Sequence, residues 1–206
     1  MTDVLIFDLD NTLYSRKRDL FSLIDQRINL YMSDIIGIPQ EEVDGLRRRY
    51  WRDYGVTLGG LIRHHGVDPE DYLGYVHDVD IQERLGDDPE LRDALACSPL
   101  RKVVFTNAST DYALRVLRCL GVDNCFEEIF DIRIASFLPK PFPEPYHRVL
   151  DRLGVEGKGC VMVEDTLENL RTAKDLGMAT VWVGEGELPA FVDVRVGCAA
   201  QVPAIF

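Results

Sequence analysis

The stretch Val4-Leu5-Ile6-Phe7-Asp8-Leu9-Asp10-Asn11-Thr12 decides the fold of this chain. Its four consecutive apolar residues, two of them β-branched, predict a strand that is buried on both faces, as in the middle of a parallel sheet. Asp8 then lies at the carboxyl end of this strand and Asp10 just beyond it. Open α/β sheets form their active sites at this edge, so we expect both aspartates to belong to one.

The close spacing of Asp8 and Asp10 favours a bound cation. Two neighbouring carboxylates repel each other, and Mg²⁺ relieves the repulsion because it prefers hard oxygen ligands. The alternative for this segment alone is a solvated surface turn, since Asp and Asn are common turn formers.

Composition limits the class of protein. The chain has 206 residues, 46% of them hydrophobic, which suffices for a large core in one domain with an insertion or in two small domains. A net charge of −12 argues against nucleic acid or an anionic membrane as a partner. No apolar stretch is long enough to span a bilayer. A chain this acidic needs a local positive centre to bind an anionic substrate, from a metal, a lysine or helix N-termini.

Cysteine usage indicates a reducing compartment. The chain has five cysteines, an odd number without a CxxC pair, which is typical of reduced thiols rather than a disulfide framework or zinc site. The first strand is predicted within three residues of Met1, so we expect no signal peptide. We therefore expect a cytoplasmic protein.

The order of predicted elements gives the fold class. Residues 15–88 show helical periodicity without a convincing strand, whereas strands and helices alternate beyond residue 100. Alternation of this kind predicts an α/β fold with a doubly wound parallel sheet. We expect residues 1–14 and 89–206 to form the core and residues 15–88 an all-helical cap inserted over its site. The predicted helices are 20–36, 41–54, 58–65, 69–79, 109–120, 143–153 and 167–176, and the later strands 102–106, 129–134, 160–164 and 179–183.

Polar residues follow three more of the predicted strands. Thr106 and Asn107 end one strand, Lys140 lies in the loop after the next, and Glu164-Asp165 ends the strand that begins at Cys160. Each alone fits an ordinary strand, loop or helix-start residue. Because strand carboxyl ends converge in a doubly wound sheet, the set together predicts one site.

This ordered set resembles the motifs of the haloacid dehalogenase superfamily of phosphotransferases, across essentially the whole chain. The inserted helices resemble the type-one cap of subfamily I. Within it, residues 7–14 (FDLDNTLY) and 50–55 (YWRDYG) with Gly60-Leu61 are most similar to the pyrimidine 5′-nucleotidase group, as are residues 105–108 (FTNA) and 115–126.

The resemblance implies roles for the acidic residues. Asp8 is the nucleophile that attacks phosphorus and forms an aspartyl-phosphate. Asp10 protonates the departing alkoxide and then takes a proton from the hydrolytic water. Mg²⁺ is held by Asp8, the backbone carbonyl of Asp10, and Asp165, with Glu164 close by. The chain has Glu-Asp where many members have Asp-Asp, so direct ligation by Glu164 stays open.

Roles follow for the other polar residues too. Thr106 and the Asn107 amide donate hydrogen bonds to phosphoryl oxygens, and Lys140 offsets the negative charge of Asp8 and the phosphate. Asn169 braces the acidic loop. Phe142 stands where many members carry an aspartate, which we interpret as a change in loop packing.

The cap is expected to contact the leaving group. Tyr54 and Arg63 are the substrate-binding candidates, within a set that could stack on or hydrogen-bond a base and also includes Tyr50, Trp51 and Arg52. The alternative is that the aromatic residues are core and the arginines solvated. We expect the run Arg47-Arg48-Arg49 to be a solvated helix face.

The predicted function is a Mg²⁺-dependent phosphomonoesterase acting on nucleoside 5′-monophosphates, of pyrimidines such as UMP and CMP by resemblance. The alternatives are a phosphatase of phosphoglycolate or sugar phosphates and a sugar-phosphate mutase. A dehalogenase is disfavoured, because Asp10 and an acidic metal pair suit phosphoryl transfer. A non-catalytic protein should have lost Asp8, Asp10, Lys140 or Asp165. The expected partner is a small phosphate monoester, and the chain could be a monomer or a homodimer.

Overall fold

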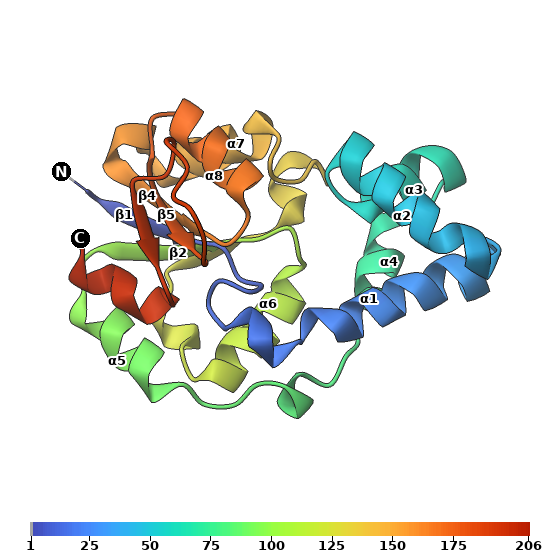
Figure 1. Cartoon of the computed structure of the whole chain (residues 1–206), viewed down its shortest axis with the longest axis horizontal. Helices are drawn as coiled ribbons and strands as arrows, with labels where there is room; N and C mark the ends of the chain where they lie inside the picture. Colours follow the sequence, from blue (N-terminus) through green and yellow to red (C-terminus); the bar gives the residue numbers. More distant parts are fainter. Residues whose placement is uncertain (1) are drawn as a thin grey trace.

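A computed structural model describes residues 2–206, which form a six-stranded parallel sheet beside a group of helices (Figure 1). The strand order is β3-β2-β1-β4-β5-β6, so the chain starts in the middle of the sheet and winds outward in both directions. This confirms the predicted α/β fold with a doubly wound parallel sheet. The strands are β1 Val4–Phe7, β2 Arg101–Phe105, β3 Glu128–Phe130, β4 Cys160–Glu164, β5 Ala179–Val183 and β6 Val194–Val196.

β1 is central because all four of its side chains are apolar and buried. Successive side chains of a strand point to opposite faces. Leu5 and Phe7 join one apolar cluster with residues of α5 and α6, while Val4 and Ile6 join another with residues of α7 and α8. Helices therefore cover both faces of the sheet; they are α5 Pro89–Cys97, α6 Thr110–Leu120, α7 Pro143–Leu153 and α8 Leu167–Asp175.

Two elements of the core were not predicted, and one was predicted too long. α5 was not predicted, although Asp88 caps it by accepting a hydrogen bond from the backbone of Leu91. β6 has three residues, of which only Val196 is buried, so its apolar pattern is too short to indicate a strand. β3 stops at Phe130 because Asp131 accepts a hydrogen bond from the backbone of Arg133 and turns the chain into a 3₁₀ helix.

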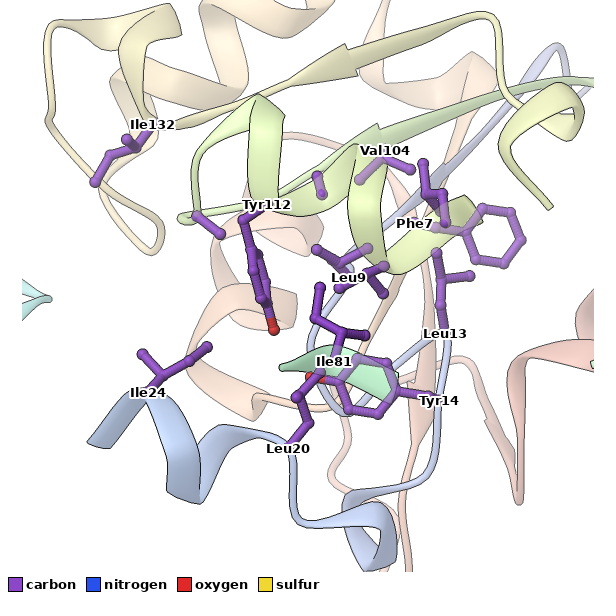
Figure 2. Close-up of a cluster of buried hydrophobic side chains, with 14 of the residues drawn as sticks. Phe7, Leu9, Leu13, Tyr14, Leu20, Ile24, Ile81, Val104, Tyr112 and Ile132 are labelled. Carbon is purple, nitrogen blue, oxygen red and sulfur yellow. The ribbon is translucent and has the colours of Figure 1, made fainter. Parts of the chain in front are cut away.

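Four helices occupy the stretch predicted to be the cap, and Figure 1 shows them gathered at one side of the molecule, away from the sheet. They are α1 Phe21–Leu30, which continues as a π-helical turn over Tyr31–Ile35, α2 Gln40–Tyr54, α3 Thr57–His65 and α4 Pro69–Val76. One buried apolar cluster extends from these helices to α5 and α6 of the core. Figure 2 shows Leu20, at the start of the cap, beside Tyr14 and Ile81, and Ile24 below Tyr112; all five side chains belong to this cluster.

The C-terminal segment packs on the core. β6 pairs with β5, and the 3₁₀ helix Ala199–Ala204 contacts α5 and buries Val202. Within residues 2–206, the five cysteines are all free thiols. None of the helices that the structure describes combines the length and apolar character needed to cross a membrane.

Candidate active site

A cavity of about 940 Å³ lies at the carboxyl edge of the sheet, where the core faces the cap. It is lined by residues that follow β1, β2 and β4 and by residues of α1, α2 and α4. The residues predicted at the strand ends meet here. The core side chains around it include Asp8, Asp10, Thr106, Asn107, Lys140, Glu164 and Asp165.

Lys140 forms the charged centre of this site. Its ammonium Nζ donates hydrogen bonds to Asp8 Oδ1 at 2.8 Å, to Glu164 Oε1 at 3.0 Å and to the carbonyl of Phe105 at 2.7 Å. The side chain is 1% exposed, so these three acceptors replace its water shell. One buried cation thus faces two buried carboxylates, which leaves net negative charge at the base of the cavity.

Asn107 positions Lys140 from the end of β2. Its Oδ1 accepts from the Lys140 backbone N–H at 2.8 Å, and its Nδ2 donates to the Lys140 carbonyl at 3.1 Å. The Asn107 side chain is therefore committed to the lysine loop. Thr106 is buried beside it, and its hydroxyl oxygen accepts a hydrogen bond from the Ala108 backbone at 3.0 Å.

The acidic pair at the end of β4 is held by residues at the start of α8 and by Arg16, which lies between β1 and α1. Glu164 Oε2 accepts from the backbone of Thr166 at 2.7 Å, and Oε1 accepts from Asn169 Nδ2. Asp165 Oδ2 accepts from the guanidinium of Arg16 at 2.9 Å. Asn169 thus braces the loop. The contact with Arg16, 149 positions away, follows from no local pattern in the sequence.

The acidic residues fit a hard divalent cation. Asp8, Glu164 and Asp165 each offer a carboxylate oxygen, and these three oxygens lie within 4.8 Å of one another. An all-oxygen donor set with surplus negative charge is what Mg²⁺ prefers. The side chain of Asp10 is outside this trio.

Burial dominates the electrostatics of both aspartates. It raises the pKa of Asp8 to about 6, with Glu164 adding to the effect and Lys140 opposing it. Burial likewise raises the pKa of Asp10 to about 6. For Lys140, burial disfavours the ammonium, but Asp8 and Glu164 outweigh it and raise the pKa. Both carboxyls therefore have a raised pKa, and only that of Asp8 is opposed by a direct hydrogen bond from Lys140.

Asp10 accepts hydrogen bonds from two tyrosines. Its Oδ1 accepts from the hydroxyl of Tyr14 at 2.5 Å and from that of Tyr112 at 2.8 Å. Burial and the negative charge of Asp10 raise the pKa of both phenols, so they remain donors. The position of Tyr14 four residues after Asp10 was a usable signal; Tyr112, 102 residues away, had none.

The cap side of the cavity differs from the prediction. Tyr54 and Arg63 are not among the described residues that line it: Tyr54 binds His64 by its hydroxyl at 2.7 Å, and Arg63 is exposed on α3. Arg47 was expected to be solvated, but its side chain is only 21% exposed and pairs with Asp25. The cap residues at the cavity include Phe21, Arg47, Trp51, Arg52 and Tyr72.

Comparison with known proteins agrees with this geometry. The family model described as haloacid dehalogenase-like hydrolase matches residues 2–177. "Phosphate metabolism protein 8" of Saccharomyces cerevisiae is 28% identical over 195 residues, which cover 86% of this chain but 60% of the yeast protein. "Phosphoglycolate phosphatase" of Colwellia psychrerythraea is 25% identical over 200 residues, covering 89% of this chain and 85% of that protein.

A solved structure shows the same fold. L-2-haloacid dehalogenase from Xanthobacter autotrophicus, with chloropropionic acid covalently bound, matches with a TM-score of 0.64 and 18% identity, covering 100% of this chain and 98% of that chain. The match of the family model over most of the sequence, together with the acid–lysine site, identifies the family. The chain belongs to the haloacid dehalogenase-like hydrolases.

Proposed function

We propose that the protein is a Mg²⁺-dependent phosphomonoesterase in which Asp8 is transiently phosphorylated. The observation that carries the proposal is the salt bridge from Lys140 to both Asp8 and Glu164, at the base of a cavity that Asp10 and Asp165 also line. The lysine favours the ionised form of Asp8, which is the form that attacks, and provides positive charge beneath a phosphoryl group.

The proposed reaction uses two carboxyl groups in turn. A carboxylate oxygen of Asp8 forms a bond to phosphorus while the bond from phosphorus to the ester oxygen breaks. Protonated Asp10 gives its proton to that departing oxygen. Water then attacks phosphorus, Asp10 takes a proton from it, and the Asp8–phosphorus bond breaks to release phosphate. A pKa of about 6 suits Asp10 to both tasks near neutral pH.

Mg²⁺ held by Asp8, Asp165 and the Asp10 carbonyl, with Glu164 near, would neutralise charge on the phosphoryl oxygens. Thr106 and the backbone N–H of Asn107 would donate hydrogen bonds to the same oxygens. A dehalogenase, which the fold also accommodates, has no need of a second carboxyl to protonate an alkoxide. Asp10 therefore favours phosphoryl transfer.

The substrate class we propose is a nucleoside 5′-monophosphate, with pyrimidine bases preferred. Support comes from aromatic side chains at the cavity: Trp51 is 58% exposed and Phe21 40%, although both are large and apolar. Exposed aromatic faces suit stacking on a planar base. Phosphoglycolate is the second candidate, favoured by the bacterial relative and by Arg47 and Arg52, whose guanidinium groups suit an anionic leaving group.

A comparison of phosphate release from UMP, CMP, phosphoglycolate and sugar phosphates tests the proposal. We expect the highest kcat/KM for the pyrimidine nucleotides and a marked fall for Trp51→Ala with these substrates. A preference for phosphoglycolate would transfer the assignment to the second candidate. Absence of phosphate release from every ester, with Mg²⁺ present, would contradict the phosphatase itself. The cytoplasmic location suggested by cysteine usage stays a prediction.

A further inference from the structure

Asp10 is bound through one oxygen only. Oδ1 accepts hydrogen bonds from Tyr14 and Tyr112, whereas Oδ2 accepts none from the residues that the structure describes. Both tyrosines are buried, with Tyr112 0% and Tyr14 5% exposed. In Figure 2 their rings lie among apolar side chains, Tyr14 in the loop after β1 and Tyr112 on α6. Two donors from separate elements therefore fix the rotation of one carboxyl group.

This arrangement gives the two oxygens of Asp10 different roles. Oδ1 is saturated by the phenols, so the proton that is exchanged with a substrate must reside on Oδ2. Acid–base help depends on hydrogen-bond distance and direction between the carboxyl and the departing oxygen. Loss of either hydroxyl would let the carboxyl rotate about its terminal bond, because only one anchor would remain.

His77 connects Tyr112, one of the two donors to Asp10, to the cap. It lies directly after α4, in the segment that returns the chain to the core, and its ring stacks on Tyr112 with centroids 4.6 Å apart and an angle of 17°. His77 Nδ1 lies 2.9 Å from the hydroxyl oxygen of Ser109. Arg115 donates to the His77 carbonyl at 3.0 Å and to the Val79 carbonyl.

These contacts attach residues 77–79, where the chain returns from the cap to the core, to α6, which carries Tyr112. We call this segment the cap exit. Ser109, Tyr112 and Arg115 all lie at the start of α6 or within it, one turn apart, so they present one face to residues 77–79. Displacement of this segment would remove the ring that covers Tyr112. The orientation of Asp10 is thereby linked to the docking of the cap.

We propose that Tyr14 and Tyr112 are positioning residues that aim Oδ2 of Asp10 at the departing oxygen, and that His77 holds Tyr112 in place only while the cap exit is docked. This inference rests on the proposed phosphatase function. It predicts a fall in kcat/KM that depends on the basicity of the leaving group, because kcat/KM reports the steps up to departure of that group and not the later hydrolysis in which Asp10 acts as base.

The test compares two phosphate esters in the full-length protein with Mg²⁺. An alkyl phosphate leaves as a strongly basic alkoxide and needs the proton; 4-nitrophenyl phosphate leaves as a stable phenolate and does not. For Tyr112→Phe and Tyr14→Phe we expect kcat/KM on the alkyl ester to fall roughly 10- to 100-fold. We expect kcat/KM on the aryl ester to stay near the wild-type value.

Three further variants sharpen the test. Tyr31→Phe is the matched control, because Tyr31 is also buried and donates to a carboxylate, Asp71, at 2.8 Å, but neither residue lines the cavity in the described structure. It should leave both esters unaffected. His77→Ala should reproduce the selective defect of Tyr112→Phe, while His77→Phe, which keeps a stacked ring, should restore most of the activity on the alkyl ester.

The possible outcomes are distinct. Equal losses of kcat/KM on the two esters, or no loss of kcat/KM on either, would overturn the positioning role while leaving the phosphatase intact. Retained activity on the aryl ester shows that each variant is folded. A wild-type protein that cleaves neither ester would instead reject the proposed function, and the positioning role with it.

Discussion

Replacing Asp10 with asparagine should abolish turnover while raising the free energy of unfolding. Burial raises the pKa of Asp10 from 3.8 to about 6, so above pH 6 the folded protein holds a charge that the unfolded chain accommodates more easily in water. A shift of roughly two units at about 1.4 kcal/mol each sets an upper limit of about 3 kcal/mol on this cost. Because Asp10 keeps some contact with solvent, we expect Asp10→Asn to gain about 1–2 kcal/mol at pH 8.

The shape of the site favours this substitution. The carbonyl oxygen of asparagine can accept both hydroxyls that Oδ1 accepts, and its amide group replaces Oδ2 at the cavity. Only the charge is lost.

The gain in the free energy of unfolding from Asp10→Asn must decrease as the pH falls. A carboxyl with a raised folded pKa destabilises the protein fully above that pKa and not at all below the unfolded value, where it is protonated in both states. The advantage of Asp10→Asn should therefore fall from pH 8 to pH 5 and vanish below pH 4.

Urea denaturation at these pH values, with EDTA to remove any metal, measures the difference. An advantage that is independent of pH, or a loss of stability at pH 8, would refute the electrostatic reasoning.

Three other perturbations test separate parts of the site. Lys140→Met leaves two buried carboxylates unpaired and should lower the free energy of unfolding by about 3 kcal/mol at pH 8, measured by urea denaturation. Lys174→Met, which removes an exposed ion pair, should lower it by less than about 1 kcal/mol. Gly55→Ala should lose about 1–2 kcal/mol in thermal unfolding, more than Gly66→Ala; both have positive φ, but only at Gly55 would a Cβ meet Pro139, at 2.9 Å. EDTA should stop phosphate release and Mg²⁺ restore it; unchanged turnover in EDTA would exclude the metal.

The strand ends were predictable because each follows an apolar run that can only be a buried strand. Asp8, Thr106, Lys140 and the acidic pair were placed in one site by this rule, and the structure brings them to one cavity. The rule uses only the order of elements and the geometry of a parallel sheet.

The rest of the site depends on contacts between distant segments. Tyr112 reaches Asp10 across 102 positions and Arg16 reaches Asp165 across 149, and neither spacing carries a local pattern. On the cap, helical periodicity predicts which residues share a face but not which face meets the core. For that reason Tyr54 and Arg63 were chosen in preference to Arg47, which the structure places at the cavity.

Direct capture of the phosphorylated enzyme tests the central claim. Rapid quenching during turnover, followed by borohydride reduction and peptide mass spectrometry, converts an aspartyl-phosphate to homoserine at the modified position. We predict homoserine at position 8 in the wild-type protein and none in Asp8→Asn. Steady turnover without this product, or the label on another residue, would contradict the account.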